Sequence, residues 1–230
     1  NVYNVAVGAL AGNAITTGIR NTLIGGLAGD ALTDADKNVA IGYLALSGDT
    51  LGSTSVAVGM GTLQNQNFTT ATNSFNTALG HEAGNDITFG TVNTLIGGLA
   101  GDALTEGNNN VAVGYAALGS DTKGDRNISI GSGSLATQNF TTSTDAYNVA
   151  IGHDAGNQIT TGGFNNLIGG LAGDALTSGN SNVAIGYASL STDTLGDRNV
   201  AIGHIALNAQ NFTTSTDSYN VGVGYQAGAS

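Results

Sequence analysis

The stretch "NVAIGYLAL", residues 38–46, decides the fold, because close variants of it recur along the whole chain. Its first five residues follow the pattern Asn-x-x-aliphatic-Gly. The pattern begins thirteen times, once with Ser in place of Asn, at Asn4, Asn21, Asn38, Ser55, Asn76, Asn93, Asn110, Asn127, Asn148, Asn165, Asn182, Asn199 and Asn220. Self-similarity at a short fixed period indicates a repeat protein rather than an ordinary globular domain.

The units are grouped in fours. Successive starts lie 17, 17, 17 and 21 residues apart, and this series occurs three times. We therefore predict one repetitive domain over 1–230, with 72-residue super-repeats at 4–75, 76–147 and 148–219 and a partial unit at 220–230. Each unit is numbered from its Asn as position 1. Positions 1 and 5 are the structural columns, represented where each group begins by Asn4, Gly8, Asn76, Gly80, Asn148, Gly152, Asn220 and Gly224.

Alternation of residue size predicts a short strand in every unit. Val-Ala-Ile places two aliphatic side chains on one face of an extended segment and a small one on the other. The Gly that follows suits a corner with a positive φ or a close backbone approach. A second extended segment is expected near "DALT" (30–33) or "NAIT" (13–16). The prediction is an all-β fold, a parallel β-solenoid of thirteen coils with a hydrogen-bonded ladder of the position 1 Asn side chains.

Each coil has few large apolar residues for its core. Position 8 is always small, from Ala11 to Ala227, and position 9 is Gly in the first two units of each group and Leu in the last two. These columns give the unit more than one apolar face, and an exposed apolar stripe usually marks an interaction surface. We therefore expect a parallel homotrimer with the position 8 residues toward the common axis. A monomeric or dimeric solenoid is the alternative.

The phrases "NVAIGYLAL" (38–46), "NVAVGYAAL" (110–118) and "NVAIGHDAG" (148–156) resemble known repeats. They are similar to the Asn-Ser-Val-Ala-Ile-Gly-x-x-Ala repeats in the YadA-like head domain of trimeric autotransporter adhesins, and to related repeats of phage tail-fibre proteins. The resemblance covers essentially the whole chain. It implies a left-handed parallel β-roll, trimerised, that acts in adhesion or receptor binding. The units of 17 or 21 residues are longer than the head repeats, which leaves the corner geometry open.

The composition excludes several classes of function. The chain has 37 Gly, no Pro, Cys or Trp, and a net charge of −11. So acidic a surface repels phosphate backbones, and we expect no nucleic-acid binding. Without an apolar run of about 18 residues, no membrane insertion is expected. Catalytic motifs are absent, and every motif recurs three or thirteen times, whereas an active site occurs once per chain. We therefore expect no enzymatic activity.

The four extra residues of every fourth unit lie in a Thr-rich segment such as "QNFTTSTDAY" (138–147). An insertion into a regular coil should bulge outward as a loop. Each loop opens with Phe and closes with Phe or Tyr, and these residues are candidates for receptor or glycan binding: Phe68, Phe75, Phe140, Tyr147, Phe212 and Tyr219. The alternative is that the rings clamp the loop onto the coils or fill the groove between protomers.

Position 6 holds His81, His153 and His204 where several other units have Tyr. A stacked row of Tyr and His on the surface is expected. A metal site formed by three copies of one His around a trimer axis is the less favoured alternative. The neighbours His81 and Glu82, like His153 and Asp154, are expected to point to opposite sides of an extended chain and to form no dyad.

Acidic residues also recur at fixed places, at Asp30, Asp102 and Asp174 and at Asp49, Asp121 and Asp193. Isolated Asp residues at turns usually accept hydrogen bonds from nearby backbone N–H groups. No cofactor is expected; Ca²⁺ is possible but not favoured, because the Gly-Gly-x-Gly-x-Asp repeat of calcium-binding β-rolls is absent. Asp125 with Arg126, and Asp197 with Arg198, are expected to form ion pairs within a turn or between protomers.

These observations predict a trimeric, fibrous surface-attachment protein, a phage tail-fibre segment or, next, a bacterial adhesin. Its partners would be other copies of the chain and a host cell-surface receptor or glycan, bound multivalently. Its location would be extracellular, on a virion tail fibre or a bacterial surface. A purely structural extracellular filament is the main alternative. An ice-binding solenoid ranks below both, because the Thr residues cluster in the inserted loops rather than forming a flat ladder.

Overall fold

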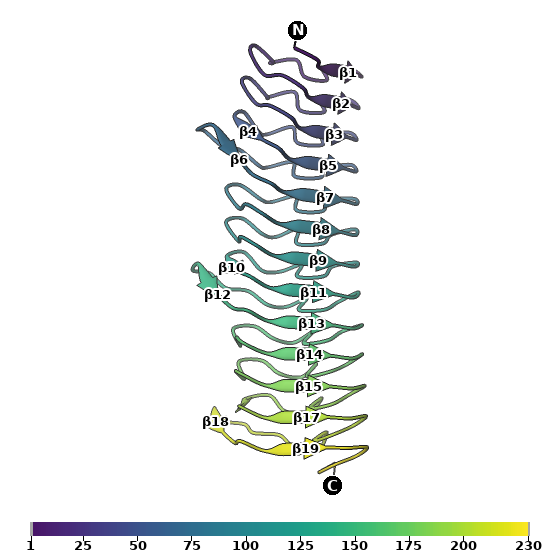
Figure 1. Cartoon of the computed structure of the whole chain (residues 1–230), viewed down its shortest axis with the longest axis vertical. Coiled ribbons are helices and arrows are strands. Elements are labelled where there is room, and N and C mark those ends of the chain that lie inside the picture. The colour runs from purple at the N-terminus through teal and green to yellow at the C-terminus, as the bar shows by residue number, and fades with distance from the viewer. Residues whose placement is uncertain (1, 230) are drawn as a thin grey trace. The chain divides into compact units, whose positions relative to one another are not determined.

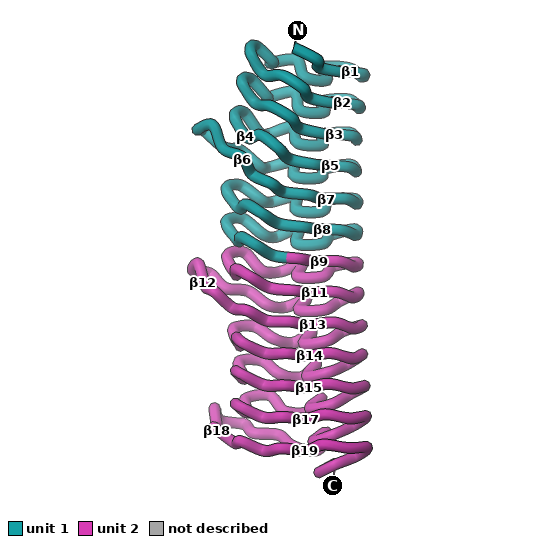
Figure 2. The backbone as a smooth tube through the Cα atoms, viewed as in Figure 1, with its two compact units in different colours: residues 1–110 teal, residues 111–230 magenta. Residues whose placement is uncertain are grey.

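The computed structural model describes residues 2–229, in two compact units, Asn1–Asn110 and Val111–Ser230 (Figure 2). Each repeat forms one coil with one three-residue strand at positions 2 to 4. In unit 1 these strands are β1 (Val5–Val7), β2 (Thr22–Ile24), β3 (Val39–Ile41), β5 (Val56–Val58), β7 (Thr77–Leu79) and β8 (Thr94–Ile96). In unit 2 they are β9 (Val111–Val113), β11 (Ile128–Ile130), β13 (Val149–Ile151), β14 (Asn166–Ile168), β15 (Val183–Ile185), β17 (Val200–Ile202) and β19 (Val221–Val223).

Within each unit, the strands of successive coils pair in parallel and in register (Figure 1). Val39 lies opposite Val56, and Asn166 lies opposite Val183, so each position of the repeat stacks on itself. The described residues contain no helix, and so none that could cross a membrane. The predicted fold class, an all-β parallel β-solenoid of about thirteen coils, is confirmed. That the repeats form one domain stays a prediction.

In the described residues, no second strand forms at the expected place in the coil, and the short second strands that occur lie at other positions, in the coils that contain or precede an inserted loop. The "NAIT" and "DALT" segments form turns, and in the first coil three successive N–H groups, those of Thr16, Thr17 and Gly18, all donate to the carbonyl of Thr33. The prediction was wrong because residues with positive φ follow the corner Gly in each coil, at position 7 and again at position 9. They curl the chain into consecutive turns instead of extending it.

The alternation within each strand directs position 3 inward and positions 2 and 4 outward. In β3, Ala40 is fully buried and its neighbours Val39 and Ile41 are half-buried. The position 8 column is also inside, since Ala28, Ala45 and most of its other members are fully buried in their own coil. The expectation that position 8 faces a trimer axis is therefore wrong. The uncovered apolar residues are instead the outward aliphatic residues of the strands.

Two kinds of core alternate along the chain. Where position 9 is Gly, position 12 is Leu or Ile, and a Cβ built on Gly29 would lie 2.7 Å from Leu32 Cδ1 and 2.9 Å from Leu23 Cδ2. Where position 9 is Leu, position 12 is Asp or Gln. The large apolar side chain is thus supplied by either position 9 or position 12, which keeps the interior filled at constant coil size.

The predicted Asn ladder is present. Asn165 accepts a hydrogen bond at Oδ1 from the backbone N–H of Asn182 in the next coil (3.0 Å) and donates from Nδ2 to the carbonyl of Gly179 in its own coil (2.9 Å). The same arrangement links Asn21 and Asn38 in unit 1. These side chains are fully buried, so each one satisfies backbone groups that water cannot reach.

Both a positive φ and a close backbone contact require Gly at position 5, as predicted. Gly152 has φ +143°, and a Cβ there would lie 2.4 Å from the carbonyl oxygen of Gly169, the equivalent residue of the next coil. Gly8 and Gly80 are held in the same way, each with a Cβ site 2.5 Å from the next Gly oxygen. Gly224, in the last coil, has the same positive φ and no such neighbour.

The residue just before position 1 of each coil also has a left-handed backbone, although it is never Gly. Val92 has φ +60° and is exposed, and a β-branched residue is strained in this conformation. Asn109, at the same place in the next coil, has φ +58° and tolerates it better. We expect Val92→Asn to stabilise the protein by about 1 kcal/mol in urea unfolding. The reverse variant, Asn109→Val, should be destabilised by a similar amount; equal stability of all three proteins would contradict this account.

Candidate functional site

The inserted segments are loops stiffened by a short strand. In each loop, residues β6 (Thr72–Asn73), β12 (Thr144–Asp145) or β18 (Thr216–Asp217) pair in parallel with β4 (Gly52–Ser53), β10 (Gly124–Asp125) or β16 (Gly196–Asp197) of the preceding coil. In unit 2, the segments around β12 and β18 project beyond the neighbouring coils, as an outward bulge predicts (Figure 1). Each loop is therefore an ordered segment, because its backbone pairs with the preceding coil.

The two aromatic residues of each loop have different environments. The opening residues Phe68 and Phe140 are only 6% and 8% exposed, and Phe212 is half-buried. Phe68 packs edge-on against Phe89, with ring centroids 6.3 Å apart. The buried rings of Phe68 and Phe140 anchor their loops, whereas Phe212 is less covered. That the opening residues bind a receptor stays a prediction. The closing residues are 45–63% exposed: Phe75, Tyr147 and Tyr219.

A buried carboxylate lies under each loop. Asp121 accepts hydrogen bonds at Oδ1 from the backbone N–H groups of Gly124 and Phe140 (both 3.0 Å) and at Oδ2 from Gln138 Nε2 (2.6 Å). Gln138 in turn accepts from Asn148 Nδ2 (2.8 Å), a member of the Asn ladder. The network recurs with Asp49, Gln66 and Asn76 and with Asp193, Gln210 and Asn220.

Sequence reasoning assigned these Asp residues to turns, and the backbone N–H bonds confirm that part. It missed their burial and their connection to the loop. The signal was available at position 12, which is Ile or Leu in half of the units and Asp or Gln in the units with Leu at position 9. A polar residue that replaces a core aliphatic at one fixed place needs buried partners, and here the loop supplies them.

Burial raises the pKa of the Asp121 carboxyl above its ordinary 3.8, although hydrogen bonds from Gln138 and Phe140 oppose this, and Asp49 behaves in the same way. The folded state therefore binds the proton more tightly than the unfolded chain. This contribution to stability is complete below pH 3.8 and is lost as the pH rises through the folded pKa.

We therefore expect the melting temperature to rise as the pH is lowered from 7 toward 4. Each kcal/mol gained should raise Tm by about 2–4 °C in a chain of this size. Reduced repulsion in a chain of net charge −11 acts in the same direction, so the specific test is a comparison of variants. The double variant Asp49→Asn, Asp121→Asn should have a flatter Tm–pH curve, whereas the exposed control Asp34→Asn should follow the parent. Identical slopes would contradict the assignment.

An arginine holds the closing end of two of the three loops. Arg126 forms an ion pair with Asp145, and its Cζ lies 5.6 Å from the centre of the Tyr147 ring. Arg198 pairs with Asp217 in the same way, with Cζ 5.7 Å from the Tyr219 ring. The first super-repeat has Thr54, Asn73 and Phe75 at the corresponding places, so the three residues change together.

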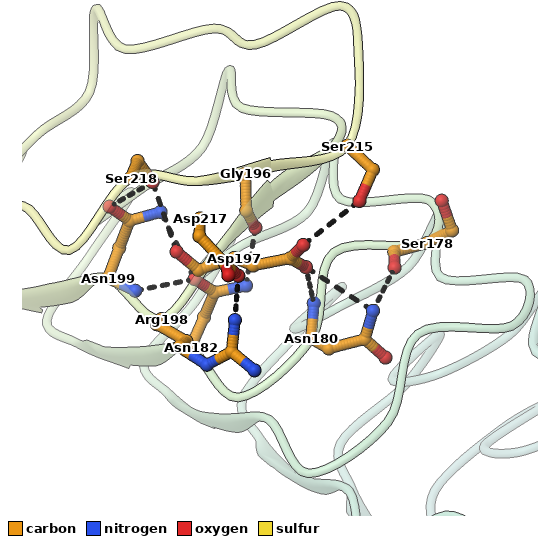
Figure 3. Close-up of polar contacts among 10 residues, drawn as sticks. All are labelled: Ser178, Asn180, Asn182, Gly196, Asp197, Arg198, Asn199, Ser215, Asp217 and Ser218. Carbon is orange, nitrogen blue, oxygen red and sulfur yellow. Dashed lines mark hydrogen bonds and ion pairs between the residues drawn. The ribbon is translucent and has the colours of Figure 1, made fainter.

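Within the chain, Arg126 and Arg198 thus pair with Asp residues of the loops rather than with the Asp before them, and pairing between protomers stays a prediction. Asp197 instead accepts hydrogen bonds from the backbone N–H of Asn180 (2.6 Å) and from Ser215 Oγ (3.0 Å), which join the preceding coil to the loop (Figure 3). Ser218 Oγ donates to Asn199 Oδ1 (2.8 Å) at the other end of the loop (Figure 3). Asp197 is the last residue of β16, whereas Arg198 follows it with a left-handed φ, and the two side chains have separate partners.

Position 6 forms a partly stacked surface row, as predicted. Tyr187 stacks on His204 with ring centres 5.4 Å apart, and His204 stacks on Tyr225 at 5.5 Å. The expectation that His and its acidic neighbour point apart is wrong: His153 Nδ1 lies 3.1 Å from Asp154 Oδ2, and His81 Nδ1 lies 3.6 Å from Glu82 Oε2. Position 7 has a left-handed φ, so the two residues belong to a turn rather than an extended strand.

The second acidic set lies at position 10. Burial raises the pKa of Asp102 and Asp174, and one carboxylate oxygen of Asp30 and one of Asp174 are buried without a hydrogen-bond partner. Within residues 2–229, no three His, Asp or Glu side chains come together as a metal site would require. The Ca²⁺ and histidine-metal alternatives stay untested hypotheses.

Comparisons of the chain with protein-family models, with curated proteins and with solved structures find no match. In the part of the chain that the structure describes, no enclosed pocket is found either. Among the described residues, the inserted loops are the segments that depart from the regular coil.

Proposed function

We propose that this chain is a segment of a fibrous surface-attachment protein, a phage tail fibre or a bacterial adhesin, located outside the cell. In this proposal it self-associates as a parallel homotrimer of left-handed β-rolls and binds a host-surface receptor or glycan. The observation that carries the proposal is the inserted loop on every fourth coil. Its buried Phe and Asp anchors hold an exposed Thr-rich tip in a constant position.

Repetition supplies the affinity. The two loops of unit 2 are four coils apart, about 19 Å at the usual strand spacing. Three loops per chain would give nine in a trimer, and weak sites linked in this way gain avidity through effective concentration. A fibre of this kind needs no deep pocket, because each tip contributes only a small part of the binding free energy.

The charges favour an uncharged ligand. The chain carries 16 acidic and five basic residues, and the two arginines at the loops, Arg126 and Arg198, already pair with Asp145 and Asp217. An anionic polymer would meet net repulsion from the acidic chain, and the two arginines at the loops are already paired. Hydroxyl groups at the tips, such as those of Thr141 and Thr142, suit hydrogen bonding to neutral sugars.

The experiment measures binding of the purified chain to bacterial cells and to a panel of neutral and acidic glycans. The test variant replaces the tip threonines by Ala in all three loops: Thr69, Thr70, Thr141, Thr142, Thr213 and Thr214. The control replaces exposed threonines at positions 13 and 14 of coils without an insertion: Thr16, Thr17, Thr160 and Thr161. Loss of binding only in the tip variant supports the proposal. Equal binding by both variants would overturn the assignment to the tips.

A purely structural extracellular filament is the second candidate. The burial of Phe68 and Phe140 and the pairing of Arg126 with Asp145 favour it, because they satisfy much of each loop internally. A chain whose function is length and stiffness would bind no cell or glycan in the same assay. The parent protein alone therefore separates the two candidates.

A further inference from the structure

An exposed phenylalanine lies beside the first inserted loop. Phe89 occupies position 14 of the coil that follows this loop and is 53% exposed. Its ring contacts the opening residue Phe68 edge-on, with centroids 6.3 Å apart, and the N–H of Asn67 donates to the carbonyl of Thr88 (3.1 Å). An edge-on contact covers at most one face of the Phe89 ring. The ring is thus fixed where the loop leaves the coil, with much of its surface open to solvent.

This ring is not needed to bury the anchor of the loop. At the second loop the corresponding residue of the following coil is Thr161. The anchor Phe140 there is 8% exposed, against 6% for Phe68 beside Phe89. The anchor is therefore buried to the same extent beside a ring or beside a threonine. A single exposed apolar residue carries little meaning by itself, but two further features of the first loop point to a ligand.

The first of these features is that this loop is uncharged. Residues 66–75 contain no Asp, Glu, Lys or Arg, whereas the second and third loops carry Asp145 and Asp217, each paired with an Arg. At the place of Asp145 the first loop has Asn73, which is exposed. The first loop therefore presents a neutral amide where the other two present an ion pair.

The second feature is the set of polar groups around the ring. Asn67, Thr69 and Thr70 are exposed on the loop, and Asn67 Oδ1 accepts a hydrogen bond from Thr50 Oγ1 (3.1 Å), which holds the amide in place. In the next coil, position 14 is the exposed Glu106. Its negative charge disfavours an anionic ligand at the ring.

This combination suits a neutral sugar. The face of an aromatic ring is electron-rich, and the C–H groups on one face of a pyranose are polarised positively, so the two stack. The hydroxyl groups at the rim of the sugar bond to amides and hydroxyls, which can both donate and accept. Phe89 supplies the ring, and the first loop supplies the amides and hydroxyls.

We propose that Phe89 and the first inserted loop form a binding site for a neutral sugar. A pyranose ring lies on the exposed face of Phe89, and its hydroxyls bond to Asn67 and to the threonines of the tip. This inference rests on the proposed attachment function and assigns its strongest site to one of the three loops. The second and third loops, which lack the ring, add weaker contacts.

The experiment measures binding of the full chain to immobilised neutral polysaccharides, a dextran, a galactan and a mannan, with alginate as the anionic comparison. The test variant Phe89→Thr recreates the coil that follows the second loop. We expect its Kd for the neutral polysaccharide that the parent binds to rise at least about tenfold. Its Tm should stay within about 2 °C of the parent, because the ring does not bury the anchor.

Two comparisons make the test specific. Phe164→Ala removes a Phe of similar exposure, 56%, from the end of a coil without an insertion, and should change Kd less than about twofold. Phe89→Tyr keeps the ring and should bind like the parent. Among the tips, Thr69→Ala with Thr70→Ala should weaken binding more than Thr141→Ala with Thr142→Ala.

Equal binding by the parent and Phe89→Thr would overturn the inference and leave the attachment function in place, since the other loops would then carry it. An equal loss in Phe164→Ala would also overturn it, as would preferential binding of alginate. A fall in Tm that accompanies the loss in Phe89→Thr would make the ring part of the scaffold. Dissociation of an assembly by Phe89→Thr in sedimentation would assign the ring to a contact between copies. A parent that binds no cell and no polysaccharide would overturn the attachment function itself, and this inference with it.

Discussion

Gly169→Ala is expected to destabilise the protein by about 4 kcal/mol or more, which corresponds to a fall in Tm of roughly 8–16 °C. Gly169 has φ +137°, a conformation that is essentially confined to Gly. A Cβ there would also lie 2.5 Å from the carbonyl oxygen of Gly186. The methyl group must therefore separate two coils, which breaks strand pairing between β14 and β15 as well as straining the backbone.

The next residue provides the matched control. Gly170→Ala adds the same methyl group one position later, at an ordinary φ and with its nearest contact at 3.6 Å. We expect its stability, measured by urea unfolding of the separated chain, to lie within about 0.5 kcal/mol of the parent. If the two alanine variants had the same stability, the positive φ and the close backbone contact would not explain the need for Gly at position 5.

The second large effect is expected for Asn165→Ala, at about 4 kcal/mol. The side chain is fully buried, and its loss leaves the Gly179 carbonyl and the Asn182 N–H without the partners that they have now. An unsatisfied buried backbone group costs about 1–3 kcal/mol, and two are created here. The lost contact with Asn148 Oδ1 (3.2 Å) adds to the effect.

Asn220→Ala is the control for the ladder. Asn220 is the exposed last member, and its side chain donates to Gln210 Oε1 (2.7 Å). We expect a cost below about 1 kcal/mol, because water can replace that partner. Chemical denaturation of both variants measures the difference. A small effect at Asn165, comparable to that at Asn220, would show that the ladder does not hold the coils together.

The chain contains one natural exception to the ladder. Ser55 replaces Asn, and its hydroxyl lies 2.6 Å from Ser74 Oγ and accepts a hydrogen bond from Gln66 Nε2 (2.9 Å). Ser74 and Gln66 belong to the segment that contains the first inserted loop. The shorter side chain is thus accepted where the loop brings extra polar groups into the interior. This supports the view that the loops are part of the scaffold as well as additions to it.

Much of the scaffold could be predicted from the columns of the repeat. The strands at positions 2 to 4, the corner Gly and the buried Asn ladder follow from residue types that recur at constant spacing, because each coil meets the next at equivalent positions. The inserted loops were found in the same way, as departures from the 17-residue period. The recurring positions did not predict the path of the backbone in the segments between them.

That path was missed because the turns are formed by residues that do not favour them. Leu27, Leu44 and Ile205 have left-handed φ values, and local sequence gives no sign of it. These turns abolish the expected second strand and bring His153 beside Asp154. They also close the coil so that position 8 lies inside, which corrected the face expected to meet another copy.

The sequence by itself therefore determined a parallel β-solenoid, its coil boundaries and the places of its three loops. Equivalent positions of successive coils contact one another, so these contacts appear in the sequence as residue types that recur at constant spacing. Only the tertiary structure decided which side of each column faces the core. It also brought Asp121 to the amide of Phe140 and Arg126 to Asp145, residues 19 positions apart in the chain. The physical reason is that a side chain is buried or exposed only after the coil has closed. Closure depends on left-handed backbone conformations at residues whose types do not predict them.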